Sequence, residues 1–422
     1  MKNREPRGPR NERWSGTDTR WSFTLFGTAV GAGILYLPVT ISLGGIWPLI
    51  FMSLFILPMT YLSHRALCRV ILTTDRGDGG ITEAVEEHFG KGAGFAITLI
   101  YFMAIYSICL VYAVGITNEF NSFFSNILHV EKLPRWFLSL VLIAGMTVVV
   151  LFGTTFMTRI SSLLVFPLIA LLFILALLGI PHWKTAAFHV VPDARHFIWA
   201  VLGGIPILVF AMNFAPVVST FAVAYRKDIP DPGMLDRKTS QIIGFNSLML
   251  FVFVLFFVFS VCLALAPERL QDALHKNISA MAVIAGIEGL RYIPLMASFI
   301  AIAAIVSSFF GHLAGSREGL NGLITKWLRR HEKDRELNLK AIDRLTIAFH
   351  VVSMWLVALF DVTIVEVISA FTAPFIAMIL YLMPMVAIHR VPALARFKTP
   401  VNVFVFLTGL ITVGGYLVAR FF

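Results

Sequence analysis

The sequence is dominated by long apolar runs whose length matches the thickness of a lipid bilayer. Two of them, Phe245–Ala266 and Pro400–Phe422, approach or exceed the roughly 20 residues that a helix needs to cross the hydrocarbon core. Of all residues, 58% are hydrophobic and only 14% are charged, against about 25% charged in soluble domains. The runs do not alternate as the strands of a membrane barrel do. The chain is therefore expected to be an all-α protein that spans the membrane many times.

Eleven spans are expected in one transmembrane transporter domain, residues 21–422, after a disordered polar tail at residues 1–20. The expected spans are 21–43, 46–67, 94–118, 135–152, 160–180, 197–224, 241–266, 293–315, 344–360, 364–388 and 400–421.

The basic charge of the chain indicates its orientation. The formal net charge is +10, and 26 of the 34 Lys and Arg residues lie in or beside the loops on the side of the N-terminus. Cytoplasmic loops carry such an excess, so we expect a cytoplasmic N-terminus and an outer, periplasmic C-terminus in a bacterial inner membrane. The same charge attracts anionic lipid, and no nucleic-acid partner is expected.

Two spans have weak centres. The first carries Gly27, Gly31 and Gly33, and each glycine costs a helix interior roughly 1 kcal/mol relative to alanine. In the sixth span, Pro216 removes the helical hydrogen-bond partner of the Met212 carbonyl. Unpaired backbone inside a bilayer is tolerated only where it is buried in protein or lines a watery cavity. The sequence therefore predicts two broken helices whose free N–H and C=O groups meet a ligand.

The broken spans occupy matching positions in two halves of five spans, about 21–180 and 197–388, with an extra helix at about 400–421. Because five is odd, the second half inserts inverted relative to the first. Paired broken helices in inverted repeats are typical of the binding site of a secondary transporter. A membrane enzyme would need clustered nucleophiles, metal ligands or paired acids, and a channel would need a continuous polar stripe. Neither pattern is found, so both remain remote alternatives.

The motif GTAVGAG…LP at residues 27–38 resembles the first helix of the amino acid–polyamine–organocation superfamily. The stretches ITEAVEEHFG, PVVSTFAVA, GHLAGSREGLNG and PFIAMILYLMPM resemble the hydroxy/aromatic amino acid permease family, on its serine/threonine side. The likeness runs from about Trp21 to Phe422. It implies a leucine-transporter-like five-plus-five fold and import of a neutral, serine- or threonine-like amino acid by proton symport and alternating access.

The same resemblance leaves several points open. Sodium is the alternative coupling ion, and an aromatic or other neutral amino acid is the alternative substrate. No cofactor and no resident metal are expected. One subunit would suffice for transport, and the oligomeric state stays open.

The resemblance places the substrate carboxylate on the amides of Gly31, Ala32 and Gly33, where a helix N-terminus would attract an anion. Glycines of membrane helices also serve close helix packing, and this alternative stays open.

The substrate ammonium and side chain would lie at the break of span six, between Phe210 and Asn213 and including Met212. Asn213 offers both donor and acceptor groups. Tyr106, near the middle of span three, would close the site with its hydroxyl, or else face lipid or the core.

The coupling ion would lie beside the carbonyls of Gly27 and Val30, which end the first half-helix. Ser307 and Ser308 on span eight would supply hydroxyls, as in related sodium-coupled carriers. The alternative for these serines is hydrogen bonding within their own helix.

Two basic residues are further candidates for coupling. His312, on the inner third of span eight, has an ordinary pKa near 6.5 that suits proton exchange, or it bonds a backbone carbonyl. Arg159, which opens span five, would provide a fixed charge near the ion position, or it anchors the span at the cytoplasmic surface.

The chain departs from the serine branch at two positions. The break of span six reads Asn213-Phe214-Ala215-Pro216, where the branch usually has Asn-His-Ser-Pro, and this makes the site more apolar. Ser307 stands where the branch commonly carries a lysine, and this removes a candidate cation or proton carrier.

Overall fold

The computed structural model describes residues 13–41, 45–75, 79–130, 133–189, 191–285, 292–331 and 337–421. Within these ranges the regular structure is entirely helical. The helices of the first half are α1 (Gly16–Ala29), α2 (Ala32–Ile41), α3 (Ile46–Leu72), α4 (Ile81–Phe123), η2 (Phe124–Leu128), α5 (Arg135–Leu151), α6 (Thr154–Gly179), η3 (Ile180–His182) and η4 (Thr185–Phe188). Those of the second half are α7 (Ala194–Ala211), α8 (Ala215–Asp228), α9 (Pro232–Ala264), α10 (Pro267–His275), α11 (Ala280–Ala285), α12 (Ile293–His331), α13 (Leu339–Leu359), α14 (Ile364–Val367), η5 (Ile368–Thr372), α15 (Ala373–Ala377), η6 (Met378–Leu382), α16 (Met383–Arg390), η7 (Pro392–Phe397) and α17 (Val401–Phe421).

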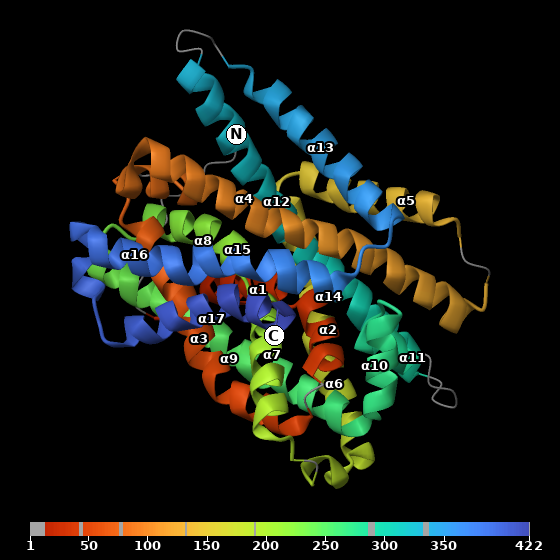
Figure 1. Ribbon diagram of the computed structural model, residues 1–422. Coiled ribbons are helices and arrows are strands. Elements are labelled where there is room, and N and C mark those ends of the chain that lie inside the picture. Colours follow the sequence, from red (N-terminus) through yellow and green to blue (C-terminus); the bar gives the residue numbers. More distant parts are fainter. Residues whose placement is uncertain are drawn as a thin grey trace.

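The helices pack into one bundle, in which α12 (teal) runs beside α4 (orange) and also contacts α6 (Figure 1). The half-helices α1 and α2 pack against α6, α7, α9 and α12. We call the end of the bundle at which α1 begins the N-terminal side, and the end at which α2 finishes the opposite side.

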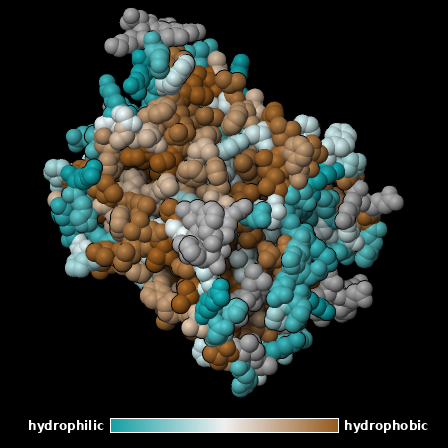
Figure 2. Space-filling model, viewed as in Figure 1, coloured by the Kyte–Doolittle hydropathy of each residue, from teal (hydrophilic) through white to brown (hydrophobic). Residues whose placement is uncertain are grey.

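Much of the visible face carries apolar side chains, and hydrophilic residues gather at its margins (Figure 2). Among the described residues, eight helices are long and apolar enough to cross a membrane, and the bent pair α1 and α2 raises this number to nine. Two further apolar helices, Arg135–Leu151 and Val401–Gly415, are shorter. The multi-pass helical fold is confirmed, whereas the count of eleven spans stays a prediction.

The first helix begins earlier than predicted. Residues 16–20, expected to be disordered, form the first turn of α1 because Ser15 and Asp18 make a reciprocal capping box. Asp18 is fully buried and pairs with the Lys238 ammonium of α9 at 2.8 Å. Tyr225 of α8 also donates to this carboxylate, at 2.5 Å. The polar sequence therefore fixes the start of α1 to two other helices, while residues 1–12 of the tail lie outside the described residues.

The charged connection before span three contains a short amphipathic helix. It forms the start of α4, and Gly90 (φ +80°) bends the chain between this segment and the spanning part. Its apolar residues Ile81, Ala84 and Val85 are buried against the bundle. The backbone N–H of Ile81 donates to the Ser219 hydroxyl of α8 at 3.0 Å. This helix is therefore attached to the half-helix that follows the second break.

Candidate functional site

The first break lies where the glycines predict it. Helix α1 ends at Ala29 and α2 begins at Ala32, with a bend of 49° between them. Val30 has an extended ψ of 90°, and its N–H still bonds the Phe26 carbonyl at 2.9 Å. The first N–H groups of a helix have no carbonyl in a preceding turn to bond. The start of α2 thus offers amides of the kind that the carboxylate prediction for residues 31–33 requires.

The second break separates α7 from α8. Met212, Asn213 and Phe214 lie between them, and Pro216 is the second residue of α8. Asn213 donates its backbone N–H to the Phe210 carbonyl at 3.2 Å, and its side-chain oxygen accepts from the Ala215 N–H at 3.1 Å. The side-chain oxygen of Asn213 is therefore engaged by the first N–H of α8, which leaves its NH₂ group as the part that can bind a ligand.

A histidine from α3 completes the second break. His64 is buried, and its Nδ1 lies 2.8 Å from the Thr60 carbonyl and must carry the proton there. Its Nε2 then accepts a hydrogen bond from the backbone N–H of Phe214 at 3.1 Å. The imidazole also stacks on the Phe214 ring, with centroids 3.6 Å apart. Sequence reasoning overlooked His64, although an ionisable side chain inside an apolar span is a signal of function.

The two broken spans touch at a glycine. A Cβ on Gly33 would come within 2.6 Å of the Ala211 Cα and 2.7 Å of the Phe210 ring. Gly27, in contrast, packs against the Val165 side chain of α6. Close packing is therefore one role of Gly33, whatever its amide binds. Gly27 and Val30 are both buried.

A polar cluster adjoins the first break. Ser308 of α12 donates its hydroxyl to the Thr28 carbonyl of α1, so the Tyr112 hydroxyl of α4 must donate to Ser308, at 2.7 Å. A side chain at position 31 would collide with both Tyr112 and Ser308. His312 lies one turn further along α12, with Nδ1 2.9 Å from the Ser308 carbonyl. Because this Nδ1 carries a proton, Nε2 is the nitrogen of His312 that can take up another.

Two predicted residues lie elsewhere. The Tyr106 ring is half-buried and stacks on Phe102 of α4 and Phe349 of α13, with centroid distances of 5.1 and 5.4 Å. The structure therefore brings Tyr112, and not Tyr106, to the break. Arg159 is exposed near the start of α6. Ser307 bonds the Ala304 carbonyl of its own helix at 3.2 Å, which is the alternative considered for it.

A cavity of about 590 Å³ leads from the first break toward the N-terminal side. Thr28 and Ser307 line its deep part, and the Arg317–Asp343 ion pair (2.5 Å) lies at its N-terminal end. It is lined by Trp21, Thr24, Thr28, Val150, Gly153, Met157, Ser161, Pro216, Val217, Thr220, Ser307, Gly311, Ala314, Gly315, Arg317, Glu318, Asn321 and Asp343.

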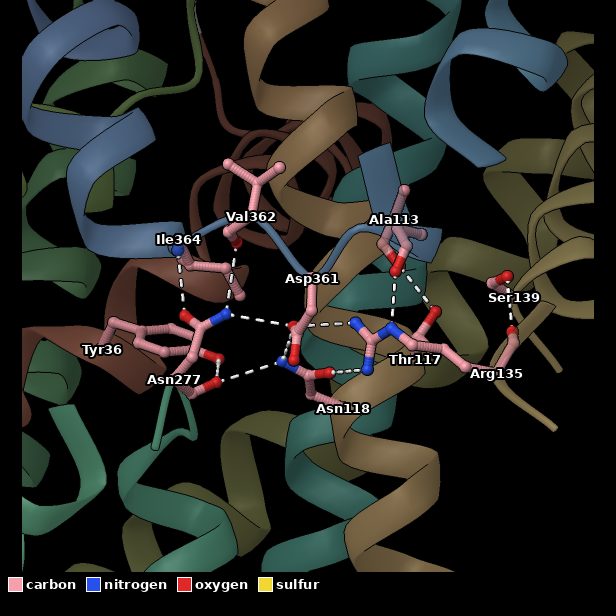
Figure 3. A network of polar contacts seen from close by, with 11 residues as sticks. Tyr36, Ala113, Thr117, Asn118, Arg135, Ser139, Asn277, Asp361, Val362 and Ile364 are labelled. Carbon is pink, nitrogen blue, oxygen red and sulfur yellow. Dashed lines mark hydrogen bonds and ion pairs between the residues drawn. The ribbon is translucent and has the colours of Figure 1, made fainter. Parts of the chain in front are cut away.

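On the opposite side, a network centred on Asp361 ties five segments together (Figure 3). The Asp361 carboxylate accepts from Arg135 of α5 at 2.8 Å and from Asn118 of α4 and Asn277 at 3.2 Å each. Asn277 follows α10, and its carbonyl accepts from the Tyr36 hydroxyl of α2 at 3.3 Å. Two asparagines, an arginine and a tyrosine thus hold α2, α4, α5 and α10 against the link between α13 and α14.

The sequence matches a known protein family. The tryptophan/tyrosine permease family matches residues 20–346. The chain belongs to this family. It is 43% identical over 415 residues to the serine transporter SdaC of Escherichia coli K12, covering 97% of this chain and 96% of that protein. It is 39% identical over 420 residues to the threonine/serine transporter TdcC of Yersinia enterocolitica, covering 95% of each chain.

The family membership confirms the resemblance seen in the sequence motifs. The fold agrees with the solved structure of MhsT in complex with L-phenylalanine, with a TM-score of 0.62 at 16% identity, covering 97% of this chain and 99% of that one. This agreement confirms the leucine-transporter-like fold class. The protein is thus a multi-pass inner-membrane transporter of an amino acid permease family, and it is not an enzyme.

Proposed function

We propose that this chain imports a neutral, serine- or threonine-like amino acid by proton symport and alternating access. The observation that carries the proposal is the meeting of two broken helices at Gly33 and Ala211, beside the Tyr112–Ser308 pair. A cavity lined by Thr28 and Ser307 lies next to this pair. The named substrates of the related serine and threonine/serine transporters support a hydroxy amino acid.

Each part of the substrate meets a suitable group at the breaks. The carboxylate lies on the amides of Gly31, Ala32 and Gly33, at the positive end of α2. When substrate binds, the Tyr112 hydroxyl, next to Gly31, turns its proton from Ser308 to the same carboxylate. The ammonium and side chain lie at Phe210, Met212 and Asn213.

Alternating access has a physical basis in the asymmetry of the two sides. The cavity reaches Thr28 and Ser307, next to the first break, from the N-terminal side, and the Asp361 network holds the opposite side together. With the N-terminus in the cytoplasm, as the distribution of Lys and Arg favours, this arrangement is an inward-facing state. The outward-facing state requires the network to open and the first and second halves, about 21–180 and 197–388, to rock against each other.

Proton coupling is supported by the bonds of Ser308. Its hydroxyl already bonds the Thr28 carbonyl and so ties α12 to α1 directly. A sodium ion at this position would have to compete with that bond for both oxygens. His312, one turn away, presents Nε2 to a proton and is therefore our first candidate for the carrier.

Sodium coupling is the second candidate. The Ser307 hydroxyl and Thr28 line the same deep part of the cavity, next to Ser308. If substrate binding moves α12, the hydroxyls and the carbonyls of Gly27 and Val30 could surround an ion.

The test is uptake into proteoliposomes of purified protein, with twenty amino acids screened under separately imposed proton and sodium gradients. We expect serine or threonine to accumulate under an inward proton gradient without sodium. Accumulation that depends on sodium would refute proton coupling. Accumulation that excludes hydroxy amino acids would refute the proposed substrate.

A further inference from the structure

A second cavity lies away from the helix breaks, where α6 and α9 finish on the opposite side. Its volume is about 390 Å³, and it is bordered by the last turns of both helices and by α10 and α11. It is lined by Leu175, Leu178, Gly179, His182, Lys184, Ser260, Val261, Ala264, Leu265, Ala266, Arg269, Ile284 and Ile293. None of these described lining residues takes part in the polar cluster or in the Asp361 network. We call this cavity the α6–α9 groove.

The inner wall of the α6–α9 groove is apolar and lies at membrane depth. Leu175 and Leu178 come from α6, and Val261 and Ala264 come from α9. Both helices are long and apolar enough to span a bilayer, so their last turns lie near the boundary of the hydrocarbon region. Leu178 is 44% exposed. A surface of this kind accepts an acyl chain.

The mouth of the groove is basic. His182, Lys184 and Arg269 are all exposed there, and the lining residues that the structure describes include no acid. The backbone N–H of Lys184 donates to the Leu263 carbonyl of α9 at 2.9 Å, which holds the lysine at the end of that helix. Trp183 adjoins it, and tryptophan is typical of the membrane–water interface. The N-terminus of α10 adds a partial positive charge.

We propose that the α6–α9 groove binds one anionic phospholipid of the phosphatidylglycerol type, with its phosphate at Lys184 and Arg269 and one acyl chain along the wall of α6 and α9. The charge distribution selects this occupant. In the predicted topology only eight of the 34 Lys and Arg residues belong to this side of the protein, yet two of them line one groove. A free phosphate would gain nothing from the apolar wall, and a zwitterionic lipid would gain little from the two cations.

The proposal does not depend on which amino acid is transported. Each Lys or Arg close to anionic lipid contributes about 1 kcal/mol, which is roughly a five-fold preference. Native mass spectrometry of the purified chain, with equal amounts of phosphatidylglycerol and phosphatidylcholine of identical acyl chains, measures this preference directly. We expect one molecule of phosphatidylglycerol to be retained at least ten-fold more strongly than phosphatidylcholine.

The decisive variant is Lys184→Ala with Arg269→Ala. The matched control is Arg195→Ala with Lys276→Ala, which removes the same charge from exposed positions of the same side outside the groove. We expect the first double variant to lose the preference and the control to keep it. In an Ala264→Trp variant, which fills the groove, both lipids should be lost with unchanged thermal unfolding. Equal retention of the two lipids by the unmodified chain, or a preference that survives Lys184→Ala with Arg269→Ala, would overturn the proposal.

Discussion

His64 of α3 accepts a hydrogen bond from the backbone N–H of Phe214, 150 positions away in the sequence, and stacks on the Phe214 ring. This contact satisfies a backbone donor that the second helix break leaves without a helical partner. Because Nδ1 of the same ring donates to the Thr60 carbonyl, only the neutral imidazole serves both contacts. His64 therefore stabilises the non-helical backbone of the second break.

We expect His64→Ala to reduce uptake at least ten-fold, since a buried N–H without a partner costs about 1–3 kcal/mol. His64→Gln retains a side-chain acceptor and should restore part of the activity. His389→Ala is the matched control, because His389 bonds the Met385 carbonyl of its own helix, away from the breaks. Uptake and membrane expression are measured together. Full activity of His64→Ala would show that the contact is dispensable.

A pair of tyrosine variants tests which hydroxyl belongs to the substrate site. Tyr112→Phe removes the hydroxyl next to Gly31, and we expect the KM for serine or threonine to rise about ten-fold, the equivalent of one hydrogen bond of about 1.4 kcal/mol. Tyr106→Phe, on the same helix but packed against α13, should change KM less than two-fold. Initial rates of uptake at varied substrate concentration give both values. A larger rise in KM for Tyr106→Phe than for Tyr112→Phe would show that Tyr106 belongs to the substrate site.

These two tyrosines show which features the sequence predicts and which it does not. The apolar runs predict the helical bundle, and Gly31, Gly33 and Pro216 predict both breaks, because each acts on its own backbone. The choice between Tyr106 and Tyr112 is different. Six residues rotate a helix by about 240°, so the two tyrosines face different neighbours. Span three is apolar on all sides, and its sequence therefore does not indicate which face meets the break.

The remaining differences have the same origin in long-range contacts. His64 meets Phe214 across 150 positions, and Asp18 meets Lys238 across the bundle. Local propensity contains no information on such pairs. The polar stretch around Asp18 looked disordered because its partners are supplied by α8 and α9.

Gly33→Ala should nearly abolish transport while leaving membrane insertion intact. The new Cβ would lie 2.6 Å from the Ala211 Cα, and a backbone atom cannot move aside as a flexible side chain can. Gly203→Ala is the control, since a Cβ at Gly203 has no neighbour within 4 Å among the described atoms. Uptake is compared at equal membrane expression. Normal uptake by Gly33→Ala would contradict both the close contact and the carboxylate site.

Arg135→Ala should make the opposite side of the bundle open more readily. The arginine donates to Asp361, Asn118 and the Ala358 carbonyl, at 2.8, 2.8 and 2.6 Å, and hydrogen bonds to charged groups contribute roughly 1.5–3 kcal/mol each. A cysteine at the buried position of Ser279, in a background without other cysteines, reports the opening through an impermeant thiol reagent. We expect labelling to accelerate at least ten-fold.

The control for this experiment is Lys276→Ala, which breaks an exposed ion pair with Asp272 on the same side. It should leave the labelling rate unchanged. If Arg135→Ala labels no faster than this control, the network around Asp361 does not keep the opposite side closed.

The last prediction concerns the driving force. We expect an inward proton gradient to drive accumulation without sodium, since moving one charge across 100 mV supplies about 2.3 kcal/mol, enough for roughly fifty-fold accumulation of a neutral substrate. If His312 is the carrier, His312→Gln keeps the exchange of labelled for unlabelled substrate, which needs only binding and rocking. It loses accumulation, because glutamine has no group that takes up a proton as Nε2 of His312 does. Nδ1 of His312 is already bonded to the Ser308 carbonyl. Accumulation by His312→Gln with unchanged pH dependence would exclude this histidine as the proton carrier. Sodium-dependent uptake that fails when Ser307 and Ser308 both become alanine would establish a sodium site instead.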